Sequence, residues 1–370
     1  MAQRILSAEN GYCQVDAWLA ETGAKSVLVV AGRSMRRLEI SAYFDTLFAR
    51  TGVKPVFFSD FSPNPRYESV TAGVRAFRGN GCDAIIAVGG GSAMDVAKCI
   101  KLFGNMPDTA CYLKQEIVPN AIPFLAMPTT AGTGSEATHF AVIYYEGTKQ
   151  SVAHDSCLPD AVLLDPAALA TLPLYQRKAT MLDALCHAIE SFWSVKSTGE
   201  SEAYAAEAIG LFWQHKDGYL ANTAAGNAGM LRAANLAGKA INLTQTTAGH
   251  AMCYKITTLY GAAHGHAAAL VNRRLWPWML AHPERCVDPR GEACLQAMFA
   301  RLGAAMGCGS AQAGAEKFAA LVESLELSVP RAAPVDFALL RASVNAVRLK
   351  NNPVALDEDA LEALYRQILR

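Results

Sequence analysis

Five short apolar runs alternate with longer amphipathic stretches in the first half of this chain. The runs are SVLVVAG, KPVFFSD, DAIIAVGG, IPFLAMP and DAVLLDP, which begin at positions 26, 54, 83, 122 and 160. Runs of this length separated by helix-sized segments are typical of a mostly parallel sheet covered by helices. We therefore expect an α/β domain over residues 1–171.

The second half lacks comparable runs from about position 172 onward. Long alanine- and leucine-rich segments with helical periodicity replace them, such as SEAYAAEAIGLFWQHKDGYLANT and AGAEKFAALVESLEL. We expect an all-helical second domain over residues 172–370. The chain has 370 residues, of which 52% are hydrophobic, and this is enough to bury the cores of two domains.

Charge and cysteine usage argue against several kinds of partner. Lysine and arginine together number 33, as do aspartate and glutamate, so the net charge is zero and no global field attracts nucleic acid or an anionic membrane. No apolar run is long enough to span a bilayer, and polar residues interrupt the N-terminus before a signal-peptide core could form. The ten cysteines form no CxxC pair, which favours reduced thiols and a cytoplasmic protein.

A glycine-rich turn follows the run DAIIAVGG and precedes a helical stretch. The turn comprises Gly89, Gly90, Gly91 and Ser92, and Asp95 stands three residues after the serine in a pattern close to a capping box. Backbone N–H groups of such a turn, together with the helix N-terminus, can bind the pyrophosphate of a dinucleotide. This interpretation makes the first domain Rossmann-like and nucleotide-binding. The alternative is an ordinary tight turn.

A second turn, PTTAGTGSEAT, follows the run IPFLAMP. It offers hydroxyl groups that can close over the same nucleotide, from Thr129, Thr130, Thr133 and Ser135. The alternative is a hydroxyl-rich turn that only caps a helix.

Four side chains in the second half suggest a mononuclear metal site. Asp183 and His187 are four residues apart in a stretch without glycine or proline, so a helix presents both on one face. His250 and His264 follow and complete a shell of one carboxylate and three imidazoles, which suits Zn²⁺ or Fe²⁺ and leaves room for a substrate oxygen. The alternative for the first pair is a local hydrogen bond within the helix.

These motifs, in this order, resemble the iron-containing, group III alcohol dehydrogenase family. The quoted segments are PNP with Asn64, GGGSAMDVAK, PTTAGTGSE, the stretch from Lys149 through LPDAVLLDP, DALCHAIE and the two later histidines. The resemblance covers most of the chain and implies a dehydroquinate synthase-like fold and NAD(P)-dependent interconversion of an alcohol and an aldehyde or ketone. It also implies one Fe²⁺ or Zn²⁺ ion on the four ligands, cofactor contacts from Asn64 and Lys149, and a homodimer.

The end of the first run bears on the choice of cofactor. NAD-preferring proteins place an acid near the adenosine ribose, and in the family that this chain resembles an Asp often occupies the position of Gly32. Gly32 leaves room for a 2′-phosphate, which Arg33, Arg36 or Arg37 can neutralise. We therefore predict a preference for NADP over NAD. The alternative is that the arginines form a solvated helix face.

The chain departs from the pattern of the family near the proposed nicotinamide site. Many members carry a histidine four residues after the first C-terminal ligand, and here Tyr254 stands there, followed by Lys255. Tyr254 can still donate a hydrogen bond, so Tyr254, Lys255 and His266 are the candidates for the catalytic residues. His266 can equally be a packed histidine that supports the site.

The segments around Lys255 and RLKNNPV resemble the branch of the family found with phosphonate metabolism, which reduces phosphonoacetaldehyde to 2-hydroxyethylphosphonate. A compact dianion needs cations, and the sequence offers Lys196, Lys255, Arg348 and Lys350. Three alternatives remain open: a dehydrogenase of small neutral alcohols, a lyase or synthase on the dehydroquinate synthase scaffold, and a nucleotide-binding protein without catalysis.

Overall fold

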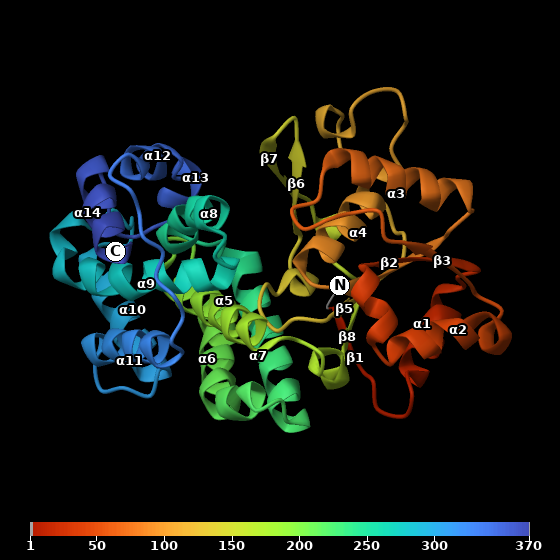
Figure 1. Cartoon of the computed structure of the whole chain (residues 1–370), viewed down its shortest axis with the longest axis horizontal. Helices are drawn as coiled ribbons and strands as arrows, with labels where there is room; N and C mark the ends of the chain where they lie inside the picture. The colour runs from red at the N-terminus through yellow and green to blue at the C-terminus, as the bar shows by residue number, and fades with distance from the viewer. Residues whose placement is uncertain (1–2, 370) are drawn as a thin grey trace. The chain divides into compact units, whose positions relative to one another are not determined.

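The computed structural model describes residues 3–369 and divides into two compact units (Figure 1). The N-terminal unit comprises residues 1–130 and 134–172, and the C-terminal unit comprises residues 131–133 and 173–370. The short segment 131–133 therefore belongs with the second unit although it lies within the first half of the sequence.

A six-stranded parallel sheet forms the centre of the N-terminal unit, in the order β1-β8-β5-β4-β2-β3. Its strands are β1 (Arg4–Ser7), β2 (Ser26–Ala31), β3 (Lys54–Phe58), β4 (Ala84–Gly89), β5 (Phe124–Pro128) and β8 (Ala161–Leu164). The five apolar runs all form strands of this sheet, which confirms the expected α/β class. The short strand β1 was not anticipated.

Helices cover both faces of the sheet because the strand residues alternate between two cores. Along β4, Ile85 and Ala87 join one hydrophobic cluster, whereas Ile86 and Val88 join the other. The first cluster is closed by α3 (Tyr67–Gly79) and α4 (Gly91–Phe103), and the second by α1 (Cys13–Thr22) and α2 (Ile40–Thr51). Both faces of the strands are thus apolar, as their near-continuous hydrophobic sequences require.

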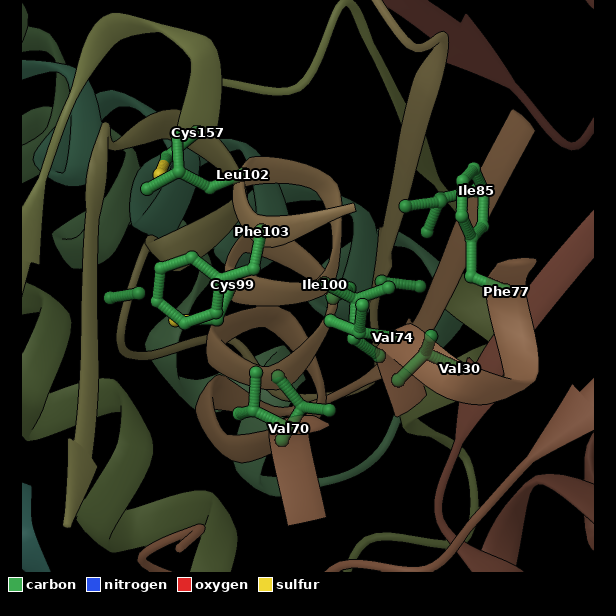
Figure 2. Packing of buried hydrophobic residues seen from close by; sticks show 14 of the residues in the cluster. Val30, Val70, Val74, Phe77, Ile85, Cys99, Ile100, Leu102, Phe103 and Cys157 are labelled. Carbon is green, nitrogen blue, oxygen red and sulfur yellow. The ribbon is translucent and has the colours of Figure 1, made fainter. Parts of the chain in front are cut away.

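Figure 2 shows the first of these clusters, where side chains of α3 and α4 meet those of the strands. Val74 of α3 lies beside Ile100 of α4. The two helices approach closely at Gly73, since a Cβ there would lie 2.3 Å from Cδ1 of Ile100. This packing fixes α4, whose first turn follows the glycine-rich loop.

A two-stranded antiparallel hairpin, β6 (Phe140–Tyr145) and β7 (Thr148–Ala153), interrupts the α/β alternation. Its turn is the dipeptide Glu146-Gly147, whose φ angles are 49° and 72°. Two consecutive positive φ values match the right-handed twist of the paired strands. Sequence reasoning did not anticipate this hairpin.

The C-terminal unit is helical throughout the part that the structure describes, as expected. Its helices are α5 (Leu174–Trp193), α6 (Gly199–Leu220), α7 (Ala224–Thr244), α8 (Ala248–Tyr260), α9 (His264–Ala281), α10 (Glu292–Ala305), α11 (Ala311–Ser324), α12 (Asp336–Ala342), α13 (Ala346–Leu349) and α14 (Glu358–Ile368). Across both units, residues 3–369 also contain six short 3-10 helices: Arg33–Arg37, Tyr112–Lys114, Ser135–Ala137, Asp155–Cys157, Pro166–Leu169 and Pro283–Arg285.

The long helices of this unit surround a buried aromatic core. Trp193 at the end of α5 meets Trp276 of α9 edge to face, with ring centroids 5.8 Å apart. No helix between residues 3 and 369 is long and apolar enough to cross a membrane.

Candidate dinucleotide and metal sites

The strand order places a topological switch point between β2 and β4. The chain leaves β2 for the edge strand β3 and then returns to β4 on the other side of β2. Gly32 follows the carboxyl end of β2, and Gly90 follows that of β4. Ligands of parallel α/β sheets bind outside the carboxyl ends at such a point.

The glycine-rich turn at this edge is packed too tightly for side chains. A Cβ on Gly89 would lie 2.6 Å from the Cβ of Ala93, and one on Gly90 would lie 3.3 Å from Oγ1 of Thr130. The second turn is tied to the first, because the N–H of Thr129 donates to the carbonyl of Gly89 at 2.9 Å. The two turns therefore form one surface next to the N-terminus of α4.

The start of α4 differs from the expected capping box. The helix begins at Gly91, its N-cap is Gly90, and no side chain caps it. Ser92 lies in the first turn, and Asp95 is turned to the interior, where it accepts a hydrogen bond from Oγ of Ser135 at 3.4 Å. An uncapped N-terminus keeps its backbone donors available to an anion.

A buried lysine that sequence reasoning missed connects α4 to the second turn. Lys98 is fully buried, and its Nζ donates to Oγ of Ser135 at 3.0 Å, to Oγ1 of Thr138 at 3.0 Å and to the carbonyl of Phe140 at 2.6 Å. Burial raises the pKa of nearby Asp95 to about 6 and lowers that of Lys98. Ser135 and Asp95, which we assigned to the cofactor, thus have interior partners.

The remaining predicted cofactor residues are spread over this unit and the segment 131–133. Arg33 is exposed next to Gly32, and Asn64 is exposed with a positive φ of 56°. Lys149 lies on β7, and its positive charge lowers the pKa of Asp95. Thr133 belongs to the C-terminal unit. Their contacts with a cofactor remain predictions.

Three of the predicted metal ligands converge in the interior of the C-terminal unit. Asp183 and His187 project from one face of α5, with Oδ1 and Nε2 4.0 Å apart, and Nε2 of His250 from α8 lies 3.4 Å from the same oxygen. All three are buried, and their ligand atoms lie within 4.8 Å of one another. Ligands about 2.1 Å from a tetrahedral ion lie roughly 3.4 Å apart, so the cluster has the dimensions of a metal site.

Glu190, one turn beyond His187 on α5, orients His250. Nδ1 of His250 lies 2.6 Å from Oε1 of Glu190, which leaves Nε2 to face Asp183. The carboxylate of Glu190 also accepts from the N–H and Oγ1 of Thr247, from the N–H of His250 and from Nδ2 of Asn272, at 2.7, 2.9, 3.3 and 2.8 Å. A carboxylate that holds the far ring nitrogen of a histidine is a common support of metal ligands.

The electrostatics of this cluster favour a cation. Burial alone would raise the pKa of Asp183 and Glu190. The surrounding histidines lower the pKa of Asp183, and His250, Asn272 and the Thr247 N–H lower that of Glu190 to about 2. Burial alone would lower the pKa of His250, but the two carboxylates raise it to about 9. Burial lowers the pKa of His187 to about 4, so this imidazole is neutral and can serve as a metal ligand. A buried carboxylate, Asp183, that faces two imidazole nitrogens suits the ligand shell of a dication.

His264 and Tyr254 lie beside this cluster. The ring of His264, at the first residue of α9, is 5.2 Å from that of His250, and its Nδ1 is 3.6 Å from Sγ of Cys253. The Tyr254 ring stacks on His264 at 5.4 Å, with an interplanar angle of 17°. Burial raises the pKa of Tyr254, so its hydroxyl keeps its proton. The role of His264 as fourth ligand remains a prediction.

His266 points elsewhere. Two residues along a helix turn by about 200°, so His264 and His266 occupy opposite sides of α9. Nδ1 of His266 lies 3.2 Å from the hydroxyl of Tyr175, which also accepts from the N–H of Ala263 at 2.9 Å. His266 lines a cavity of about 350 Å³ with Tyr175, Tyr260, Gly261, Ala262, Ser328, Pro330 and Arg331. The geometry therefore gives its assignment as a catalytic residue no support.

The four cations considered for an anionic substrate have different environments. Lys196 is exposed and donates to Oε1 of Gln245 at 3.0 Å, and Lys350 is exposed. Lys255 is half-buried on α8, next to Tyr254 in the chain. Arg348 is half-buried on the short helix α13, which packs against α8.

Two glycines that sequence reasoning overlooked let the ligand helices approach. A Cβ on Gly249 would lie 2.4 Å from Oε1 of Glu190, and one on Gly265 would lie 2.5 Å from the Cβ of Asp183. Spacing could have identified Glu190, because positions 183, 187 and 190 share one helix face. No sequence spacing could have identified Gly249 and Gly265, because their close contacts are with residues of other helices.

Sequence comparisons agree with this geometry. The model of the family described as "Iron-containing alcohol dehydrogenase" matches residues 2–166, and that of "Fe-containing alcohol dehydrogenase family, C-terminal" matches residues 178–369. A phosphonoacetaldehyde reductase from Streptomyces viridochromogenes is 35% identical, covering 80% of this chain and 79% of that protein. A 1,3-propanediol dehydrogenase from Citrobacter freundii is 32% identical, covering 72% and 71%.

Structural comparison gives the same result. The crystal structure of a 1,3-propanediol oxidoreductase superposes with a TM-score of 0.86 at 26% identity, covering 99% of this chain and 98% of that chain. Both family models together span nearly the whole sequence. The chain is therefore an oxidoreductase that belongs to the iron-containing alcohol dehydrogenase family.

Proposed function

We propose that this protein reduces phosphonoacetaldehyde to 2-hydroxyethylphosphonate with NADPH. The observation that carries the substrate is the 35% identity to a phosphonoacetaldehyde reductase, which extends over 312 residues. The matched dehydrogenases of 1,3-propanediol favour a second candidate, a general reductase of small neutral aldehydes.

The reacting carbonyl is proposed to bind at the histidine cluster of the C-terminal unit. Asp183, His187 and His250 would hold a divalent ion, with His264 as the fourth ligand, and that ion would polarise a carbonyl for hydride attack by the reduced nicotinamide. Glu190 keeps the ring of His250 in place, and burial keeps water from the buried ligand atoms. Tyr254 remains protonated and is the proposed hydrogen-bond donor near the reacting oxygen.

The preference for NADPH is proposed from the carboxyl end of β2. A Cβ on Gly32 would meet only Oγ of Ser34, at 3.9 Å, and the backbone φ of Gly32 is −69°. Gly32 thus leaves open space for a 2′-phosphate, at a position where the carboxylate of an aspartate would repel that phosphate. Arg33 beside it is exposed. The helix-face alternative applies best to Arg36, which pairs with Asp45 at 3.4 Å.

Replacing Gly32 by aspartate is expected to move the cofactor preference toward NADH by about 100-fold in the ratio of kcat/KM values, because the carboxylate repels the 2′-phosphate and can accept from a ribose hydroxyl. The ratio is measured by steady-state oxidation of NADPH and NADH. Gly79→Asp is the matched control, since Gly79 also has open space and is exposed. A wild type that prefers NADH, or a Gly32→Asp variant with an unchanged ratio, would contradict the proposal.

The substrate is tested by NADPH oxidation with phosphonoacetaldehyde, propanal and butanal, with Fe²⁺ or Zn²⁺ added or withheld. A metal-dependent preference of at least tenfold for phosphonoacetaldehyde is expected. Equal or better turnover of the neutral aldehydes assigns the general reductase instead. Absence of metal-dependent oxidation with every aldehyde would reject reduction altogether and reopen the lyase and non-catalytic alternatives.

A further inference from the structure

We propose that Arg348 is the residue that binds the anionic group of the substrate, so that this enzyme selects small aldehydes carrying a phosphonate or a similar compact anion. The inference rests on the proposed function for the identity of the aldehyde. The inference extends the proposed function by naming one of the four candidate cations as the residue that determines specificity.

The first observation is a buried guanidinium nitrogen, Nη1, of the half-buried Arg348 that has no hydrogen-bond partner among residues 3–369. Buried guanidinium groups are ordinarily paired, because removing their hydration without replacing it costs several kcal/mol. An anionic ligand that accepts a hydrogen bond from Nη1 would gain a charge-assisted contact that water does not weaken.

The second observation is that the chain holds Arg348 in place without using its charge. The side chain of Asn345 accepts from the N–H of Arg348 at 3.0 Å and caps α13. Three residues after Arg348, Nδ2 of Asn351 donates to the carbonyls of Thr244 and Thr246 at 2.8 and 3.0 Å, and its Oδ1 accepts from Ser194 at 2.9 Å. These contacts hold the backbone around Arg348 and use none of the donors of its guanidinium.

The third observation places this charge near the reacting site. The short helix α13, which carries Arg348, packs against α8, which carries Tyr254 and the predicted ligand His250. The Tyr254 ring stacks on His264, which in turn lies beside His250. The helix of Arg348 therefore lies beside the helix that carries Tyr254 and His250.

The other cations fit this role less well. Lys196 already donates to Gln245, and Lys350 is exposed, so water screens its charge. Lys255 is half-buried on α8 but carries a flexible ammonium. The planar fork of an arginine binds two oxygens of a phosphonate at once and discriminates better against neutral aldehydes.

The test combines kinetics with direct binding. Arg348→Met is expected to lower kcat/KM for phosphonoacetaldehyde on the order of 100-fold, mainly through KM, and to change that for propanal by less than about threefold. Arg348→Lys should recover part of the loss. Calorimetric titration with methylphosphonate should show binding to the wild type that Arg348→Met abolishes. Arg232→Gln removes the same charge from an exposed pair with Glu207 and is the matched control.

The outcomes separate this inference from the proposed function. If the wild type prefers phosphonoacetaldehyde and Arg348→Met keeps that preference, Arg348 is not the anion-binding residue although the function stands. If the wild type prefers propanal yet binds methylphosphonate through Arg348, the anion site stands and the proposed substrate falls. Equal methylphosphonate binding by wild type and Arg348→Met overturns the inference in either case, and circular dichroism melting confirms that both are folded.

Discussion

Replacing Asp183 by asparagine is expected to remove the bound metal and to lower kcat/KM by about 1,000-fold or more. The substitution keeps the shape of the side chain but deletes the carboxylate whose Oδ1 faces Nε2 of both His187 and His250. The ion would then lose its only anionic ligand, and with it several kcal/mol of charge stabilisation in the transition state. Metal content is measured by elemental analysis of the purified protein, and activity by NADPH oxidation.

The same loss should follow from chelation of the wild type and should be reversed by adding back Fe²⁺ or Zn²⁺. Asp217→Asn is the matched control, because Asp217 is exposed and pairs only with Lys216 in the described chain. It should retain metal and activity. An Asp183→Asn variant that keeps one equivalent of metal and more than a tenth of the activity would exclude this cluster as the metal site.

Local sequence patterns predicted the sheet and the ligand pair because both depend on residues close in the chain. Five of the strands of the sheet required only an apolar run, and the shared face of Asp183 and His187 required only helical spacing. The hairpin β6–β7 was missed although its turn, Glu146-Gly147, sits between two alternating segments. That sequence carried a usable signal.

Spacing could place Glu190 on the ligand face of its helix, but the roles of the supporting residues could not be predicted, because those roles depend on contacts between distant segments. Glu190 accepts from Thr247, 57 residues later, and Lys98 donates to Ser135, 37 residues later. Neither partner differs in type from many other hydroxyl residues of the chain. Likewise, residue type could not separate Arg348 from the three lysines, whereas the buried Nη1 of Arg348, which has no partner in the described chain, does. Periodicity identifies helix faces, but not which groups they will meet.

Replacing Glu190 by glutamine is expected to weaken metal binding by about 10- to 100-fold and to destabilise the protein by roughly 3 kcal/mol. All five contacts of the carboxylate are with donors: His250 through its ring and its N–H, Thr247 through two groups, and Asn272. An amide must turn its own NH₂ toward some of these donors and leave them unsatisfied, at about 1–3 kcal/mol each. His250 would then lose the anchor that directs its Nε2 toward Asp183.

Unfolding in urea with excess chelator isolates the structural part of this loss, and competition with a chromogenic chelator measures the affinity for metal. Glu202→Gln is the matched control, since Glu202 pairs with Arg301 at a partly exposed site and should cost about 1 kcal/mol or less. The two quantities discriminate between roles. A variant that loses stability but binds metal as tightly as the wild type would make Glu190 a structural residue only. Weaker metal binding, measured where the variant is fully folded, would show that Glu190 acts on the ion through His250.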